Sequence, residues 1–295
     1  MLSLHTNNAA LSAQSSISKT QGTLSTSMTR LSTGYRINSA MDDAAGLQIA
    51  TRLKAQTSGM TVAMSNTQNS TSLLQTAMGA FNEVTNMLVR MKDLATQAAD
   101  VSSSANDKTA MQAEYNALGS ELYNVITNTT FGGTKLLGNG TVATSGTLSA
   151  AMTFQIGADA SEKMTVGVAT DMATLSTSLL AATVNFSSVA VSGAGAAELT
   201  GAGAANATIT KLATAIENVS TVNSALGAAA NRLDHINNNL ANISSNTKAA
   251  SGRIMDVDFA TESSSMTASQ MLLQAGTAML KQSNSMSSMV MSLLQ

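Results

Sequence analysis

The side chains best suited to acid–base chemistry stand close together at residues 30–50, RLSTGYRINSAMDDAAGLQIA. Two adjacent carboxylates, Asp42 and Asp43, follow Arg30 and Arg36 in this stretch. Paired carboxylates can act as general acid and base when both face one substrate. Neighbouring residues of a helix point about 100° apart, however, and the stretch contains no histidine. The pattern therefore favours a structural joint over a catalytic pair.

The other candidates for catalysis or metal binding are the two histidines, His5 and His235. Neither has a second histidine or a cysteine at the spacing of a zinc site. The chain has no cysteine, which excludes disulfides, thiolate metal ligands and a cysteine nucleophile. A Gly-x-x-x-x-Gly-Lys phosphate loop is absent as well. We therefore expect no enzyme activity, no cofactor and no bound metal.

Composition narrows the classes of partner. Of 295 residues, 44% are hydrophobic, which is ample for a core, but only 11% are charged, against about 25% in average domains. The formal net charge is −2 and Lys and Arg form no run, so neither nucleic acid nor a membrane is an expected partner. The N-terminal segment MLSLHTNNAALSAQ lacks the basic region of a signal peptide. Any export is expected to follow a dedicated route.

Apolar residues recur every seven positions along two long segments, which is the pattern of a coiled-coil seam. Proline, which interrupts helices, is absent from the chain. We therefore predict long helices within residues 45–127 and 209–250 that pack as a bundle. The first series is Leu53, Met60, Leu74, Phe81, Leu88 and Ala95, with Thr67 as its break, and the second is Leu212, Val219, Leu226, Leu233 and Leu240.

Shorter elements lie between these two series. Residues 104–107 fit a capping box that opens a helix, and FGGTKLLG at residues 131–138 ends that helix. Apolar and polar residues alternate on either side of GADASEK and predict one small β-hairpin. Residues 183–208 are rich in Gly, Ala, Ser and Thr and lack a sustained period, so we predict a surface loop there.

Both chain ends are predicted to form nearly uncharged amphipathic helices. Residues 1–29 and 263–295 contain one charged residue each, Lys19 and Lys281. Because apolar stripes are poorly suited to face water, we expect those on the two helices to be buried against each other and against neighbouring copies. The stripe residues are Leu24 and Leu31 near the N-terminus, and Leu272, Met279, Met286 and Leu293 near the C-terminus.

A bend is predicted after the first of these helices. Gly34 can adopt the left-handed conformation that ends a helix, and residues 39–42 fit a second capping box. Asp42 and Asp43 are then expected in the first turn of the next helix, where carboxylates interact favourably with the helix dipole. Arg30 and Arg36 are available to pair with acidic residues of this chain or of a neighbour.

The segment SSISKTQGTLSTSMTRLSTGYRINSAMDDAAGLQIA resembles the N-terminal signature of bacterial flagellin. Segments at 88–100, 131–138 and 253–284 and the closing SLLQ also resemble flagellin, in the same order, and only about residues 183–208 fall outside. The resemblance implies a mainly α fold with long coiled-coil-like helices from both chain ends packed as a bundle, and a small β-hairpin. It implies an inner domain of residues 1–41 and 256–295, an outer helical-bundle domain of 42–182 and 209–255, and a variable loop at 183–208.

The same resemblance implies a secreted structural subunit that polymerises into the extracellular flagellar filament. Partners would be further copies of the chain, an export chaperone, and the cap and junction proteins. Contacts between subunits are expected at the stripe residues and at Arg30, Arg36, Asp42 and Asp43. Two alternatives stay open, a hook-filament junction protein and a monomeric secreted helical protein that binds a receptor.

A receptor contact is also implied by the resemblance. The Toll-like receptor that senses flagellin in animals binds positions matched here by Arg90, Leu94, Gln97 and Glu114. In the family this surface overlaps an assembly face that is exposed in monomers. Subunit packing is therefore the expected native role of these residues, and receptor binding is a consequence of it.

Overall fold

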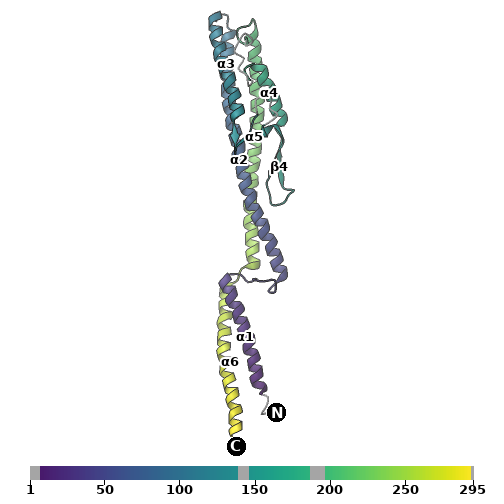
Figure 1. Ribbon diagram of the computed structural model, residues 1–295, viewed down its shortest axis with the longest axis vertical. Coiled ribbons are helices and arrows are strands. Elements are labelled where there is room, and N and C mark those ends of the chain that lie inside the picture. The colour runs from purple at the N-terminus through teal and green to yellow at the C-terminus, as the bar shows by residue number, and fades with distance from the viewer. Residues whose placement is uncertain (1–6, 139–145, 187–196, 294–295) are drawn as a thin grey trace. The chain divides into compact units, whose positions relative to one another are not determined.

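The computed structural model describes residues 7–138, 146–186 and 197–293, with side chains as far as Met286. The fold is mainly α, as predicted, and divides into two compact units (Figure 1). The helices are α1 (Asn8–Thr33), α2 (Ala44–Ala99), α3 (Ala105–Asn128), α4 (Ala169–Ala182), α5 (Ala204–Met255) and α6 (Phe259–Leu293), with a 3-10 turn η1 (Thr147–Ser149). The strands are β1 (Thr130–Phe131), β2 (Thr134–Lys135), β3 (Met152–Gln155) and β4 (Lys163–Val166).

The first unit, called the terminal unit, comprises Met1–Thr57 and Ser245–Gln295. The second, called the central unit, comprises Ser58–Ser244. Helices α2 and α5 each contribute residues to both units. The boundaries between the compact units thus fall inside long helices, whereas the sequence suggested domain boundaries near the helix ends at residues 41 and 256.

In the terminal unit α1 and α6 lie side by side and run in opposite directions (Figure 1). The Asn7 side chain donates a hydrogen bond to the Ser283 carbonyl (3.3 Å), and farther along the pair Arg30 lies 3.7 Å from Glu262. Positions shielded from solvent recur every three or four residues on both helices, the spacing of a coiled-coil seam. They are Ala10, Ala13, Ile17, Thr20, Leu24, Ser27 and Leu31 on α1, and Met266, Ser269, Leu273, Gly276, Leu280 and Ser283 on α6.

Small and hydroxyl side chains let these two helices pack with almost no charge. A Cβ atom on Gly276 would lie only 2.9 Å from Ile17 Cγ1, so a side chain there would force Ile17 or one of the helices to shift. Threonine hydroxyls donate to carbonyls one turn back in their own helix, as Thr20 does to Ser16 (2.9 Å). These donors are satisfied without a partner outside the helix, which makes burial of such a surface less costly.

Helix α1 ends as predicted. Gly34 has the left-handed φ of 76°, and its N–H donates to the Arg30 carbonyl at 2.9 Å. The chain that follows pairs with the segment between α5 and α6, because Tyr35 and Asp256 form an isolated antiparallel bridge. The turn after α1 is therefore fixed by backbone hydrogen bonds to a segment distant in sequence.

The capping box predicted at residues 39–42 is wrong in its placement. Asp43, immediately before α2, is the cap, since its Oδ1 accepts a hydrogen bond from the Gly46 N–H (2.9 Å). Asp42 instead closes the preceding turn, where its Oδ2 accepts from two backbone N–H groups, that of Ser39 at 2.9 Å among them. Both carboxylates therefore precede the helix and do not lie in its first turn.

Most members of the two seven-residue series lie in the core of the central unit, as predicted, whereas Leu53 is half-buried in the terminal unit. Leu74, Phe81 and Leu88 of α2 are fully buried, and so are most members of the α5 series. The break in the first series, Thr67, is itself buried, and its hydroxyl donates to the Ala63 carbonyl at 2.8 Å. A polar residue is tolerated on this seam because its hydrogen bond stays within α2.

The predicted start of α3 and the predicted hairpin are both confirmed. The Asp107 N–H donates to Ser104 Oγ (3.2 Å), and the Ser104 N–H donates to Asp107 Oδ2 (3.0 Å), which completes the capping box. Strands β3 and β4 pair antiparallel, with Met152 opposite Val166. The segment FGGTKLLG forms a further hairpin, β1–β2, that the sequence analysis missed; its two central glycines have φ of 58° and 83°, as a tight hairpin turn requires.

The described part of residues 183–208 is not simply a surface loop, and the rest of the predicted loop, residues 187–196, lies outside the described residues. Helix α5 begins inside this range, and Leu199 and Thr208 are almost completely buried. The Gln112 side chain of α3 donates to Glu198 Oε2 (2.8 Å) and accepts from the Leu199 N–H (2.7 Å). Hydrogen bonds to a neighbouring helix thus hold the end of the segment in place, which a composition rich in small residues does not reveal.

Candidate functional site

Four apolar side chains of α6 are exposed outside the seam with α1. Their exposed fractions are 60% for Met271, 62% for Leu272, 67% for Met279 and 57% for Met286. We call these four residues the α6 flank. Three of them belong to the predicted stripe and repeat every seven residues, so they line one side of the helix. The fourth predicted stripe residue, Leu293, ends α6 beyond the described side chains.

The α6 residues that pack on α1 include those that directly follow the flank residues Leu272 and Met279 in the sequence. Leu273 and Leu280 are half-buried, whereas Leu272 and Met279 are exposed. Both series have seven-residue spacing, and one residue turns the helix by about 100°. One side of α6 therefore packs on α1, and the adjacent apolar side has no partner within the described residues.

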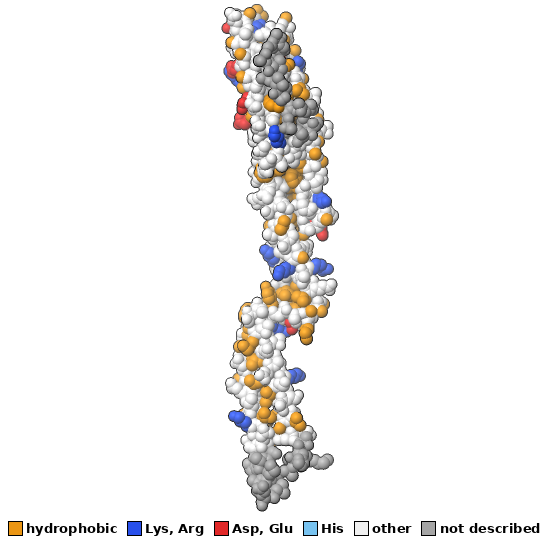
Figure 2. Space-filling view, in the orientation of Figure 1, with side chains coloured by type: hydrophobic (Ala, Val, Ile, Leu, Met, Phe, Trp, Pro, Cys, Tyr) orange, Lys and Arg blue, Asp and Glu red, His pale blue; other side chains and the backbone are white. Residues whose placement is uncertain are grey.

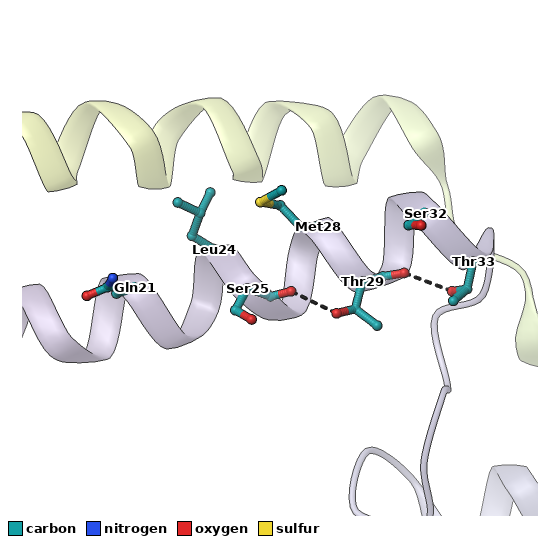
Figure 3. Close-up of a pocket in the computed structure, with 7 residues that line it drawn as sticks. All are labelled: Gln21, Leu24, Ser25, Met28, Thr29, Ser32 and Thr33. Atoms are coloured by element: carbon teal, nitrogen blue, oxygen red, sulfur yellow. Dashed lines mark hydrogen bonds between the residues drawn. The ribbon is translucent and has the colours of Figure 1, made fainter.

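On α1 the predicted stripe residues Leu24 and Leu31 are half-buried and take part in packing within the chain. Leu11 and Met28, by contrast, are 53% and 56% exposed. A groove of about 530 Å³ runs along this helix, and in Figure 3 Leu24 and Met28 point toward α6 while Thr29 points away. The groove is lined by Gln21, Leu24, Ser25, Met28, Thr29, Ser32 and Thr33.

Charged side chains are sparse along the α1–α6 pair. Figure 2 shows hydrophobic side chains along the α1–α6 pair with few Lys, Arg, Asp or Glu side chains among them. Lys281 is the only charged residue in the range 263–295. A partner that covers the α6 flank would therefore remove apolar surface from water while desolvating few charges, the condition that favours a stable protein interface.

The predicted arginine contacts serve the chain itself. Arg30 pairs with Glu262 of α6, and its Nε is buried without a hydrogen-bond partner. The Arg36 guanidinium donates to the Ile254 carbonyl at 2.9 Å. These two interactions connect the N-terminal and C-terminal segments, so a contact of either arginine with a second subunit remains a prediction.

The two carboxylates are exposed at the turn before α2. Hydrogen bonds from the Ser39 and Asn38 backbone lower the pKa of the Asp42 carboxyl, and Arg30 adds a smaller electrostatic contribution. Asp43 accepts the capping hydrogen bond described above. Their roles in this structure are to close a turn and to cap a helix, and their role as subunit contacts is still a prediction.

The four predicted receptor residues are only partly available at the surface. Arg90 and Glu114 form an exposed ion pair, with Nη2 to Oε1 at 2.6 Å, and Gln97 is exposed nearby in sequence on α2. Leu94 is only 3% exposed and belongs to the core of the central unit. The receptor contact stays a prediction for all four residues, and the burial of Leu94, whose side chain helix α2 turns inward, does not favour it for that side chain.

Sequence reasoning did not single out Phe259, which is 56% exposed at the start of α6, or the outward position of Met271. Phe259 continues the seven-residue spacing of the seam residues Met266, Leu273 and Leu280, which was a usable signal. Within the described ranges, no helix combines the length and hydropathy needed to cross a bilayer. The described side chains also include no group of three His, Asp or Glu residues placed to bind a metal ion.

Two family models match the chain, the bacterial flagellin N-terminal helical region over residues 4–143 and the C-terminal helical region over residues 209–294. Flagellin A of Vibrio anguillarum is 34% identical over the whole of both chains. The chain belongs to the bacterial flagellin family. Flagellin A of Vibrio cholerae serotype O1 is 33% identical, again over the full length of both chains.

As a flagellin, the chain is a structural subunit of the flagellar filament. A solved structure assigned to a flagellar hook-associated protein of Vibrio parahaemolyticus superposes with a TM-score of 0.54, covering 73% of this chain and all of that chain at 15% identity. That likeness shows a shared fold alone, so the junction-protein alternative is not favoured over flagellin. Residues 144–208 lie between the two matched regions, a wider gap than the segment 183–208 that the sequence suggested.

Proposed function

We propose that this flagellin polymerises by burying the α6 flank, together with the exposed residues Leu11 and Met28 of α1, against neighbouring copies of the same chain. The observation that carries the proposal is the flank itself. Its four apolar side chains are 57–67% exposed on a helix that offers only Lys281 as a charge beyond residue 262. Such a surface is costly in water and favourable at an interface.

The size of the effect is appropriate for assembly. Full burial of a large apolar side chain contributes about 1.5 to 3 kcal/mol, and each flank residue still has more than half of its surface to bury. Assembly can therefore gain about 1 to 2 kcal/mol from each flank side chain. Four of them contribute about 4 to 8 kcal/mol per subunit, which is comparable to the lower part of the range for the loss of translational and rotational freedom on association.

The hydroxyl chemistry of the terminal helices supports the same proposal. Thr267 Oγ1 donates to the Ser263 carbonyl (2.9 Å) and Thr277 Oγ1 to the Gln274 carbonyl (2.9 Å), each within α6. A polar group that is buried without a partner costs about 1 to 3 kcal/mol. Because these hydroxyls already have acceptors, a neighbouring subunit can cover them without that penalty.

Other partners follow from the extracellular position of the filament. We propose that the chain is secreted through the flagellar type III apparatus, and that it meets an export chaperone and the cap and junction proteins. The exposed Arg90–Glu114 pair and Gln97 support a contact with the flagellin-sensing Toll-like receptor in the monomer. That contact would use these polar side chains and not Leu94.

Sedimentation of the purified full chain tests the assembly proposal. Leu272→Asp and Met279→Asp place a carboxylate on the flank, and Ser285→Asp places one at an exposed polar position of the same helix. An unpaired carboxylate is strongly disfavoured at a buried position. We expect the first two variants to stay in the supernatant at concentrations where the wild type and Ser285→Asp form sedimenting filaments. Equal pelleting of all four proteins would contradict the proposal.

A further inference from the structure

Sulfur in this chain occurs only as thioether. The sequence has 19 methionines and no cysteine, so any reversible oxidation of sulfur must occur at methionine. The described methionines differ sharply in accessibility. Met271, Met279 and Met286 on the α6 flank are exposed, as are Met28 on α1 and Met41 in the turn before α2, whereas the core methionines of the central unit are at most 8% exposed. Those core residues are Met60, Met91, Met111, Met152, Met164 and Met172.

Two of the three flank thioethers are also regularly placed. Met279 and Met286 are seven residues apart and share one side of α6 with Leu272. At 1.5 Å per residue their backbone positions are about 10 Å apart along the helix axis, and Met271 is adjacent to Leu272. The surface that assembly would bury therefore carries three of the five exposed methionine side chains among the described residues.

We propose that Met271, Met279 and Met286 are oxidation sites through which a peroxide-class oxidant blocks polymerisation of the free subunit; this inference rests on the assembly function proposed above. In the reaction the thioether sulfur attacks one peroxide oxygen and the O–O bond breaks as the S–O bond forms. The sulfur loses two electrons, the peroxide gains two, and the second oxygen leaves as water after proton transfer. The product is methionine sulfoxide.

The physical consequence follows from the polarity of the product. A sulfoxide carries a strong hydrogen-bond acceptor where the thioether was apolar, and an interface formed by the flank would bury that oxygen without a donor. Assembly in turn shields the sulfur, so the filament should resist the oxidant that inactivates the monomer. Because a methionine sulfoxide reductase reverses the reaction, the block should be reversible.

The experiment uses the full chain and hydrogen peroxide. Monomer is treated, the oxidised methionines are mapped by peptide mass spectrometry, and the critical concentration for polymerisation is measured by sedimentation before and after treatment. We expect oxidation of the three flank methionines, and of the likewise exposed Met28 and Met41, while the core methionines stay reduced. The critical concentration should rise roughly tenfold or more, the factor produced by one buried unpaired polar group per contact. Treatment with methionine sulfoxide reductase should restore the original value.

Two triple variants provide matched controls. Replacing Met271, Met279 and Met286 by Leu preserves apolar volume, so this variant should polymerise before treatment. After treatment its critical concentration should rise less than that of the wild type, because Met28 is then the remaining exposed methionine of the proposed assembly surface. The corresponding Leu variant of the core residues Met152, Met164 and Met172 should keep the sensitivity of the wild type. If the flank variant loses competence as readily as the wild type, or if wild type with oxidised flank methionines polymerises normally, the inference is overturned. Failure of untreated wild type to polymerise would instead overturn the assembly function and, with it, the inference.

Discussion

Shortening one flank side chain, in the variant Leu272→Ala, should weaken assembly while leaving the fold of the single chain nearly unchanged. Leu272 is 62% exposed in the single chain, so the variant removes little packing from the α1–α6 pair. If a neighbour covers the remaining surface, the lost burial is about 1 to 2 kcal/mol per subunit contact. That free energy corresponds to a rise in critical concentration of roughly 5- to 30-fold.

Sedimentation across a concentration series measures this shift, and thermal unfolding followed by circular dichroism measures the fold. Leu273→Ala is the matched variant on the seam, where the side chain is half-buried against α1, and it should lower the melting temperature of the terminal unit more than Leu272→Ala does. Ser285→Ala is the control at an exposed polar position. The reasoning is refuted if Leu272→Ala changes the critical concentration no more than Ser285→Ala.

Further outcomes follow from the terminal helices, the bend after α1 and the cap of α3. Deleting residues 1–30 or 266–295 should abolish polymerisation while the central unit keeps its helical circular dichroism; filaments from either truncated chain would refute a role for the terminal helices in assembly. Gly34→Val should destabilise the terminal unit by roughly 1 to 2 kcal/mol in thermal unfolding, because a β-branched residue resists φ of 76°, and an unchanged melting curve would argue against the strain. Hydrogen bonds from Ser104 lower the pKa of Asp107 below its ordinary 3.8, so the folded state binds fewer protons than the unfolded state, and this stabilisation is present above about pH 4 and lost as pH falls further. In the variant Asp107→Asn, the free energy of unfolding, measured by urea denaturation, should therefore decrease less between about pH 5 and about pH 2 than in the wild type. A pH profile identical to the wild type would contradict that role.

The helical core was predictable because its signal is redundant. In α2 and α5 the seven-residue series extends over many turns, and the interior members Leu74, Phe81, Leu226 and Leu233 are all fully buried. No charged residue interrupts either series. The same regularity located α3, whose capping box is formed by side chains adjacent in sequence. Local hydrogen bonds of this kind can be inferred without knowledge of distant residues.

The orientation of α6 was not predictable from spacing alone. Leu272 and Met279 are seven residues apart, and so are Leu273 and Leu280, so two neighbouring sides of this helix are apolar. Only the contact with α1 decides which side faces inward. Gly276 was a usable cue, since the absence of a side chain marks the close approach to Ile17.

The parts of the central unit that were missed depend on contacts between segments distant in sequence. Helix α4 carries Met172, Leu175 and Leu179 at helical spacing, all buried, yet its short length gave a weak periodic signal. The burial of Leu199 depends on Gln112, far away in the chain. Nothing in the composition of residues 183–208 indicates that hydrogen bond.

The central claim, that neighbouring copies cover the α6 flank, is tested most directly by cryo-electron microscopy of the assembled filament at side-chain resolution. Our account predicts that Leu272, Met279 and Met286, each more than half exposed in the single chain, contact another subunit and lose most of their exposed surface. It also predicts that Leu273 and Leu280 keep their contact with α1 of the same chain. A filament in which the three flank side chains still face solvent would contradict the claim.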